Sequence, residues 1–356
     1  MVYINTALGT ASRTGQTLAG IMAWIIEFLM VNSKPILQVL VLPGLAFTLV
    51  FSIVAIWFER KFLARAMLRV GPYYCGGRSG VLQIFADFIK LFLSEIIIPN
   101  DVNWLFFALC PVLVSFVPAL ALILIPFDVN WVLWDIGSLG LPMFIAIMGI
   151  APLMPIFAGW VSNNKYSFIG AWRVAYMYIS GEIPLVICAA AVAIMAGTFD
   201  LVGIVEAQKN MWFAVSQFIG FIIFFIGVLI ESERTPFDIP VAETELVFGW
   251  RTEFSGILWG FTMMAEYVML QAWTLLFITL YLGGYSGPII MGNVIGSHIF
   301  WLLAKFCIVI VFVILLRCIF SRPRMDQMLK IGWNYLTPIS LLNLFIVLGL
   351  KLWGVY

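Results

Sequence analysis

Eight segments of this chain are long and apolar enough to cross a membrane as helices. A helix of about 20 residues spans the roughly 30 Å of bilayer hydrocarbon. The segments cover approximately residues 35–58, 102–126, 138–160, 168–197, 211–232, 256–281, 297–319 and 335–354. A mean hydropathy of +1.07 over 356 residues exceeds what a soluble core of this size could bury. We therefore expect an all-α polytopic membrane protein with about eight transmembrane helices.

The long apolar segments also define the domain organisation. Strands of a β-barrel would be about ten residues long with a two-residue period, which these segments lack. With no long polar insert, residues 34–356 read as a single transmembrane helical domain. Residues 1–33 contain an apolar run interrupted by Glu27 and no cleavable signal pattern. We expect a short interfacial helix there, with a ninth span as the alternative.

Basic residues indicate the orientation, because Lys and Arg accumulate in short cytoplasmic loops. Fourteen of them lie on one side of the predicted spans, against four on the other and Lys305 within a span. This asymmetry predicts that both termini face away from the cytoplasm. In the cytoplasmic loop 59–100, the segment Val81–Glu95 carries apolar residues on one helical stripe and polar residues near the other. It predicts an amphipathic helix in the membrane plane, either a peripheral element or a lip for a lipophilic ligand.

Three ionisable residues lie within the predicted spans, namely Glu182, Glu266 and Lys305. A charge near the bilayer centre costs about 2.5–3.5 kcal/mol, so such residues normally face water or a partner. Buried carboxyl and amino groups can exchange protons near neutral pH. A proton relay is the functional interpretation, and a Glu–Lys pair that joins helices is the structural one.

The loop 231–255 concentrates six carboxylates in a chain in which only 10% of residues are charged. Glu231 closes the fifth span, and Glu243, Glu245 and Glu253 lead towards the sixth. Apolar and aromatic residues lie between these acids, so we expect the loop to fold back into the bundle or against a partner subunit.

Other classes of site find no support in the sequence. A net charge of +1 without a basic, aromatic-rich stretch gives no reason to expect a nucleic-acid partner. The five cysteines show no CxxC spacing and the single histidine, His298, stands alone, so metal and iron–sulfur sites are unsupported. We interpret His298 as a satisfied polar residue at a helix end.

Several motifs together resemble the H-type (ND1-like) membrane subunit of respiratory complex I. They are Glu59-Arg60-Lys61, Arg69-Val70-Gly71-Pro72, the run 162–167, RTPFDIP at 234–240, AETELV at 242–247 and Arg324-Met325-Asp326-Gln327. They occur in the family's order and spacing over about 35–354. Met67, Tyr73, Gly181, Val241 and Ser94 depart from the usual residues of the family.

The resemblance implies a subunit at the junction of the peripheral and membrane arms of a proton-translocating quinone oxidoreductase. Its partners would be the other subunits of both arms, quinone as substrate, and lipid, with no redox centre or tightly bound cofactor on this chain. The resemblance places Glu182, Glu231, Glu266, Glu243, Glu245 and Glu253 on an acidic proton path, to which the position of Lys305 adds a candidate. It implies that Arg60, Arg69, Arg234 and Asp238 organise the quinone chamber or its loop.

Two other functions remain open on the sequence. A membrane-bound hydrogenase-type complex uses the same fold without needing quinone. A secondary transporter would show two homologous halves, and no internal repeat relates 35–197 to 211–354. We expect a multi-pass protein of the bacterial inner membrane, with an organellar inner or thylakoid membrane as the alternative.

Overall fold

The computed structural model describes residues 44–128, 132, 137–241, 243–288 and 294–353, and over these ranges the chain is helical without strands. Six helices in the described part are long and apolar enough to cross a membrane. The all-helical, multi-pass fold is thus confirmed. The N-terminal segment 1–33 lies outside the described residues, and the side of the membrane that each terminus faces stays a prediction.

The longer helices follow the predicted spans in chain order. They are α3 (Leu45–Ala66), α4 (Gln83–Leu93), α5 (Trp104–Leu122), α6 (Gly140–Ile150), α7 (Leu153–Val161), α8 (Lys165–Ala196), α11 (Phe218–Glu231), α13 (Gly256–Tyr281), α14 (Val294–Ile319) and α16 (Thr337–Leu352). Short elements between them include α9 (Leu201–Ala207), α10 (Phe213–Ser216), α12 (Glu243–Leu246), α15 (Met325–Lys330) and a π-helix (Ile331–Leu336).

Two of the eight expected spans differ from a long apolar helix, for separate reasons. Helix α3, described from Leu45, continues beyond the expected end at residue 58 through Glu59, Arg60 and Lys61, so its second half is charged. Helix α11 has only 14 residues. At about 1.5 Å per residue it is shorter than the hydrocarbon core.

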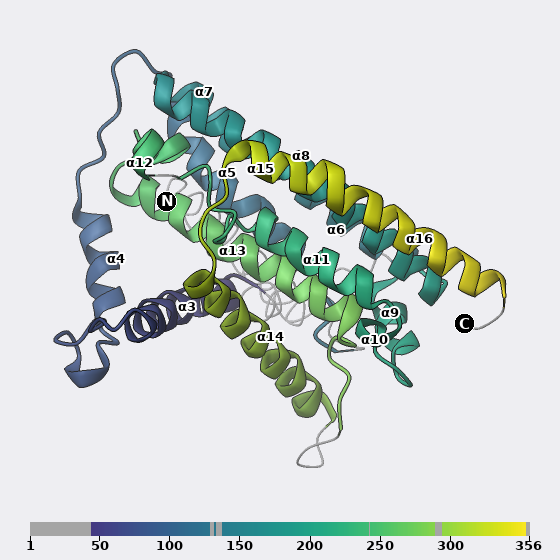
Figure 1. Ribbon diagram of the computed structural model, residues 1–356. Helices are drawn as coiled ribbons and strands as arrows, with labels where there is room; N and C mark the ends of the chain where they lie inside the picture. The colour runs from purple at the N-terminus through teal and green to yellow at the C-terminus, as the bar shows by residue number, and fades with distance from the viewer. Residues whose placement is uncertain (1–43, 129–131, 133–136, 242, 289–293, 354–356) are drawn as a thin grey trace, which may run out of the picture.

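Helix α13 forms the centre of the bundle. It contacts α5 and α11 on one side and α3, α4 and α14 on the other. Its second half is almost entirely buried, from Tyr267 to Tyr281. Helices α8 and α16 run side by side along one edge, whereas α3 and α14 cross the opposite side of α13 (Figure 1). Residues of both groups of helices, α8 with α16 and α3 with α14, can therefore contact the loop between α11 and α13.

Local signals set the ends of the helices around this loop. The Asn164 side chain caps α8 by accepting a hydrogen bond from the backbone N–H of Tyr166 at 2.9 Å. Gly197 ends the same helix with φ 75°, a left-handed conformation that glycine adopts without strain. These caps allow a single uninterrupted helix of 32 residues to pass the loop.

The amphipathic segment Val81–Glu95 contains α4, which packs on α3 and α13. Its polar side is tied to α3, because the Arg60 guanidinium pairs with Asp87 at 2.5 Å. Phe85, Ile89 and Phe92 are exposed on this chain. An apolar helix face of this kind is suited to lipid or a lipophilic ligand.

Candidate functional site

The loop between α11 and α13 folds back into the bundle, as its apolar residues suggested. Glu231, Ser232, Glu233 and Arg234 are all buried, and so is Arg251 at its far end. Buried charges in proteins need partners. The structure supplies them in two adjoining clusters.

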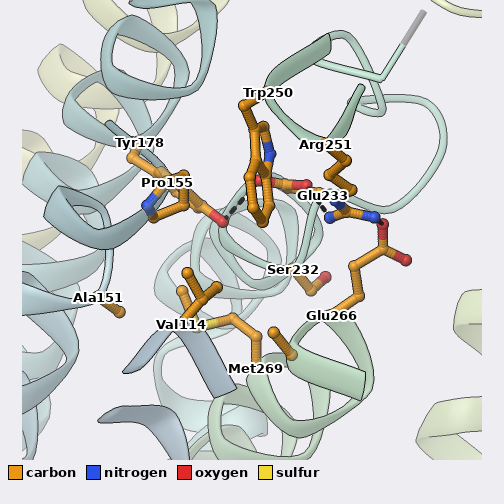
Figure 2. A pocket seen from close by; sticks show the side chains of 11 residues that line it. Val114, Ala151, Pro155, Tyr178, Ser232, Glu233, Trp250, Arg251, Glu266 and Met269 are labelled. Atoms are coloured by element: carbon orange, nitrogen blue, oxygen red, sulfur yellow. Dashed lines mark hydrogen bonds and ion pairs between the residues drawn. The ribbon is translucent and has the colours of Figure 1, made fainter. Parts of the chain in front are cut away.

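Arg251 holds two carboxylates in the first cluster. Its Nη2 donates to Glu233 at 3.0 Å, and its Nη1 pairs with Glu266 of α13. The Tyr178 hydroxyl of α8 donates to the other Glu233 oxygen at 3.0 Å. Figure 2 shows these side chains converging from α8, the loop and α13, with the Trp250 ring beside them. The guanidinium carbon lies 4.7 Å from the centre of that ring. One cation therefore serves two acids, the buried Glu233 and the partly buried Glu266.

Glu59 of α3 is the centre of the second cluster. It accepts hydrogen bonds from Arg234 at 3.0 and 3.1 Å and from the Tyr267 hydroxyl at 2.9 Å, and it also pairs with Arg317 of α14. The Arg234 guanidinium carbon lies 4.2 Å from the centre of the Tyr267 ring. The charges are reversed relative to the first cluster, since here one acid serves two cations.

A cavity of about 180 Å³ lies between the clusters. Its lining includes Glu233, Arg234, Asp238, Arg251, Glu266, Tyr267, Arg317 and Arg322. A second cavity of about 20 Å³, drawn in Figure 2, shares Glu233, Arg251 and Glu266 with the first. Both are large enough for water, and both are below the roughly 300 Å³ at which sites for drug-sized ligands begin. The three shared residues thus separate two spaces that can hold water.

Burial changes the acidity of the loop carboxyl groups. Burial raises the pKa of Glu233 to about 7, opposed by Arg251 and reinforced by Glu266. Burial, together with Glu266, also raises the pKa of Asp238, although Arg322 pairs with it at 2.7 Å and acts in the opposite direction. Glu233 can therefore gain or lose a proton near neutral pH.

Glu231 and Glu182 form a separate acidic pair deeper in the bundle. They are close enough for their charges to interact, and neither oxygen of Glu231 has a hydrogen-bond partner among the described residues. Two glycines make room for them. A Cβ at Gly149 would lie 2.8 Å from Oε1 of Glu182, and one at Gly181 would lie 3.2 Å from Oε1 of Glu231.

Of the residues proposed from the sequence, the structure brings Arg234, Asp238 and Glu266 to one cavity and places Glu231 near Glu182. The others lie elsewhere. Glu245 pairs with Arg173 at 2.5 Å on an exposed surface, and Glu253 accepts a hydrogen bond from Asn164. Glu243 begins α12, and its side chain lies outside the described part.

Lys305 and the two arginines near α4 are also separate from the clusters. The Lys305 ammonium donates to the carbonyls of Leu282, Gly284 and Ser286 at 2.8, 2.9 and 2.8 Å. It forms no pair with a glutamate in the described structure. Arg60 pairs with Asp87, and Arg69 is exposed beside Met67. His298 makes a hydrogen bond of 2.6 Å to Asp128, as expected of a satisfied polar residue near a helix end.

Sequence reasoning missed several members of the clusters, chiefly Glu59, Glu233, Arg251 and Arg317. Glu59 and Glu233 could have been found, because Glu59 belongs to the Glu59-Arg60-Lys61 motif and Glu233 lies in the acidic loop 231–255. The roles of Arg251 and Arg317 depend on contacts to residues far away in the sequence, and no local pattern indicates them.

Comparisons with known proteins agree with the resemblance. The sequence model of the NADH dehydrogenase family matches residues 38–348. The chain is 41% identical to the H-type subunit of NADH-quinone oxidoreductase from Geobacillus kaustophilus (strain HTA426), over 87% of this chain and 92% of that protein. The corresponding proteins of Geobacillus sp. (strain WCH70) and Bacillus thuringiensis (strain Al Hakam), which bear the same name, are 41% and 40% identical, over 89% and 86% of this chain and 96% and 93% of theirs. On this match over most of its length, the chain belongs to the NADH dehydrogenase family.

Proposed function

We propose that this chain is the membrane subunit of a complex I-type quinone oxidoreductase, and that it couples quinone reduction to proton translocation. Relatives that match most of its length are named as the H-type subunit of NADH-quinone oxidoreductase. The proposed partners are the other membrane-arm and peripheral-arm subunits, with quinone as the substrate and lipid around the bundle. The proposed location is the bacterial inner membrane, with the charged loops on the cytoplasmic side.

The cluster of Glu233, Arg251 and Glu266 is the observation that carries the coupling role. Glu233 and Glu266 share one guanidinium, so protonating Glu233 leaves Glu266 paired and changes the local charge by one unit. Water-sized space on both sides gives protons a way in and a way out. Glu231 and Glu182 would continue the path into the bundle.

The surface formed by α3, α4 and α13 is the proposed quinone entrance. The exposed apolar face of α4 suits a lipophilic tail, and Arg60 and Arg69 lie at the charged end of this surface. The 180 Å³ cavity is too small to enclose a whole quinone. We therefore infer that the headgroup site is completed by a neighbouring subunit and that the cavity itself carries water and protons.

Replacing Glu266 with Gln in the assembled complex tests this function. Glu266→Gln keeps the shape of the side chain and removes its charge, so we expect proton translocation and quinone reduction to fall at least tenfold. Electron transfer to an artificial acceptor should be unchanged. The matched control is Glu245→Gln, which removes an acid paired on the exposed surface. Normal proton translocation in an assembled Glu266→Gln complex would refute the coupling role.

A further inference from the structure

A second group of buried polar side chains lies at the other end of α11, away from the acidic clusters. Gln217 precedes this helix, Tyr281 ends α13, and Asn343 lies within α16. All three are almost fully buried. Within the described structure, Oε1 of Gln217, Nδ2 of Asn343 and the Tyr281 hydroxyl have no hydrogen-bond partner. A buried polar atom without a protein partner is commonly satisfied by ordered water.

The Gln217 and Asn343 side chains are held against a common space, and the Tyr281 hydroxyl lies close to Asn343. The amide nitrogen of Gln217 already donates to the Ala191 carbonyl at 3.3 Å and contacts Sδ of Met195 at 2.9 Å, which leaves its oxygen free to accept. Gln217 and Asn343 line the same cavity of about 20 Å³. Such a volume is sufficient for one water molecule.

Gly220 brings Tyr281 into this arrangement. A Cβ at this position would lie 2.8 Å from Nδ2 of Asn343 and 3.0 Å from the Tyr281 hydroxyl. Both polar atoms therefore lie against the same point on α11. Phe221, Phe224 and Phe277 surround the Tyr281 ring. Phenyl groups offer the hydroxyl no conventional hydrogen-bond partner, and its polar neighbours are the Cys188 thiol and the Asn343 amide beside Gly220.

We propose that Gln217, Asn343 and Tyr281 form a binding site for an ordered water molecule. The water donates to the Gln217 oxygen and accepts from the Asn343 amide, and the Tyr281 hydroxyl is its third partner. Three hydrogen bonds are typical of a buried water. The cavity extends to Lys351, whose side chain is exposed, so the water can exchange with the surface. This site does not depend on the proposed function.

A structure of the assembled complex, at a resolution that shows ordered water, tests the proposal. We expect a density peak at hydrogen-bond distance, about 2.7–3.2 Å, from both Oε1 of Gln217 and Nδ2 of Asn343. Absence of the peak would overturn the proposal. A direct hydrogen bond between the two amides would overturn it equally.

Two glycine-to-alanine variants test which residues bind the water. Gly220→Ala places a methyl group against the end of the Asn343 side chain, which can rotate away, so the fold should persist while the water is lost. Gly349→Ala in α16 is the matched control, because its Cβ would meet no atom within 4 Å. We expect the peak to vanish only in Gly220→Ala. A peak that survives in that variant would contradict the assigned partners.

Discussion

Two buried positive charges in this bundle are satisfied in opposite ways. Arg251 lies between the carboxylates of Glu233 and Glu266, and the pKa of Glu233 is raised to about 7. Lys305 lies among three backbone carbonyls beyond the end of α13, and these cannot titrate. The Trp212 ring, 5.3 Å from its ammonium, adds a further neutral partner. Burial of a charge is thus common to both sites, whereas a neighbouring carboxyl group with a pKa near neutral, that of Glu233, lies beside Arg251.

This difference separates the proposed coupling site from a site with a structural role. An ammonium on the carbonyls at a helix C-terminus neutralises unpaired backbone acceptors and the negative end of the helix dipole. It fixes the connection that follows α13. Lys305 was placed on the proton path by its position within a span, and its contacts favour a role in holding α14 to α13.

The largest effect is expected for Arg251→Met. The substitution leaves the buried Glu233 and the partly buried Glu266 without their shared cation, and breaking a buried pair in this way costs about 3–5 kcal/mol. We expect quinone reduction to fall by two orders of magnitude or assembly to fail. Arg251→Lys should recover part of the activity if assembly is intact.

Arg173→Met is the control for Arg251, because it breaks a pair with Glu245 that is exposed on the surface. An exposed pair contributes about 0–1 kcal/mol, so activity and assembly should stay within twofold of the unaltered complex. The measurement is quinone reduction per assembled complex. Equal losses in both variants would mean that the ion pairs of Arg251 matter no more than the exposed pair of Arg173.

Lys305→Met should have the next largest effect, on assembly. Leaving several buried carbonyls without a donor costs about 1–3 kcal/mol for each group that water cannot reach. We expect the amount of assembled complex to fall several-fold, with the number of protons translocated per electron unchanged. Lys209→Met, which breaks an exposed pair with Glu206, is the control. A lower proton-to-electron ratio in Lys305→Met would return this residue to the proton path.

Glu233→Gln should change the pH dependence more than the maximal rate. The pKa of Glu233 is raised to about 7, so the carboxyl is mostly protonated at pH 6 and mostly ionised at pH 8. Because glutamine resembles the protonated form, the variant should match the unaltered complex at pH 6 and be a few-fold slower at pH 8.

The same shift has a consequence for stability. A raised carboxyl pKa means that the native chain loses stability as pH rises from the ordinary carboxyl pKa of 4.5 to about 7, and Glu233→Gln should remove that loss. The pH dependence of quinone reduction in Glu233→Gln is measured between pH 5.5 and 8.5, with electron transfer to an artificial acceptor as the reference. If the rate of the variant still changes with a midpoint near pH 7, the titration belongs to another group.

The helices of this fold were largely predictable because apolar length is a local property. Each of the eight segments contains a described helix, but their ends and breaks were not all predictable. Helix α3 continues through its charged residues because Glu59 finds partners on α13 and α14. The fifth segment breaks at Gln217, whose side chain bonds across to α8. Tertiary contacts decide both features.

The acids of the site were predictable from the sequence, but the residues that pair with them were not. Glu231, Glu266 and Asp238 stand out because carboxylates are rare in such a chain. The partners of Glu59, in contrast, are 175 and 258 residues away. Lys305 was predicted from its position within a span, and its backbone carbonyl partners could not be predicted from that position.

The smallest effect is expected for Arg69→Ala, which probes the entrance rather than the clusters. Arg69 is exposed, and its guanidinium contacts only Sδ of Met67, at 2.8 Å, among the described side chains. Exposed charges contribute about 1 kcal/mol or less, so quinone reduction should fall at most about fivefold. The loss should appear in the KM for quinone if Arg69 helps to admit the substrate, with transfer to an artificial acceptor intact. An equal fall in both activities would mean misassembly, and no change in KM would confine the entrance to α4 and α13.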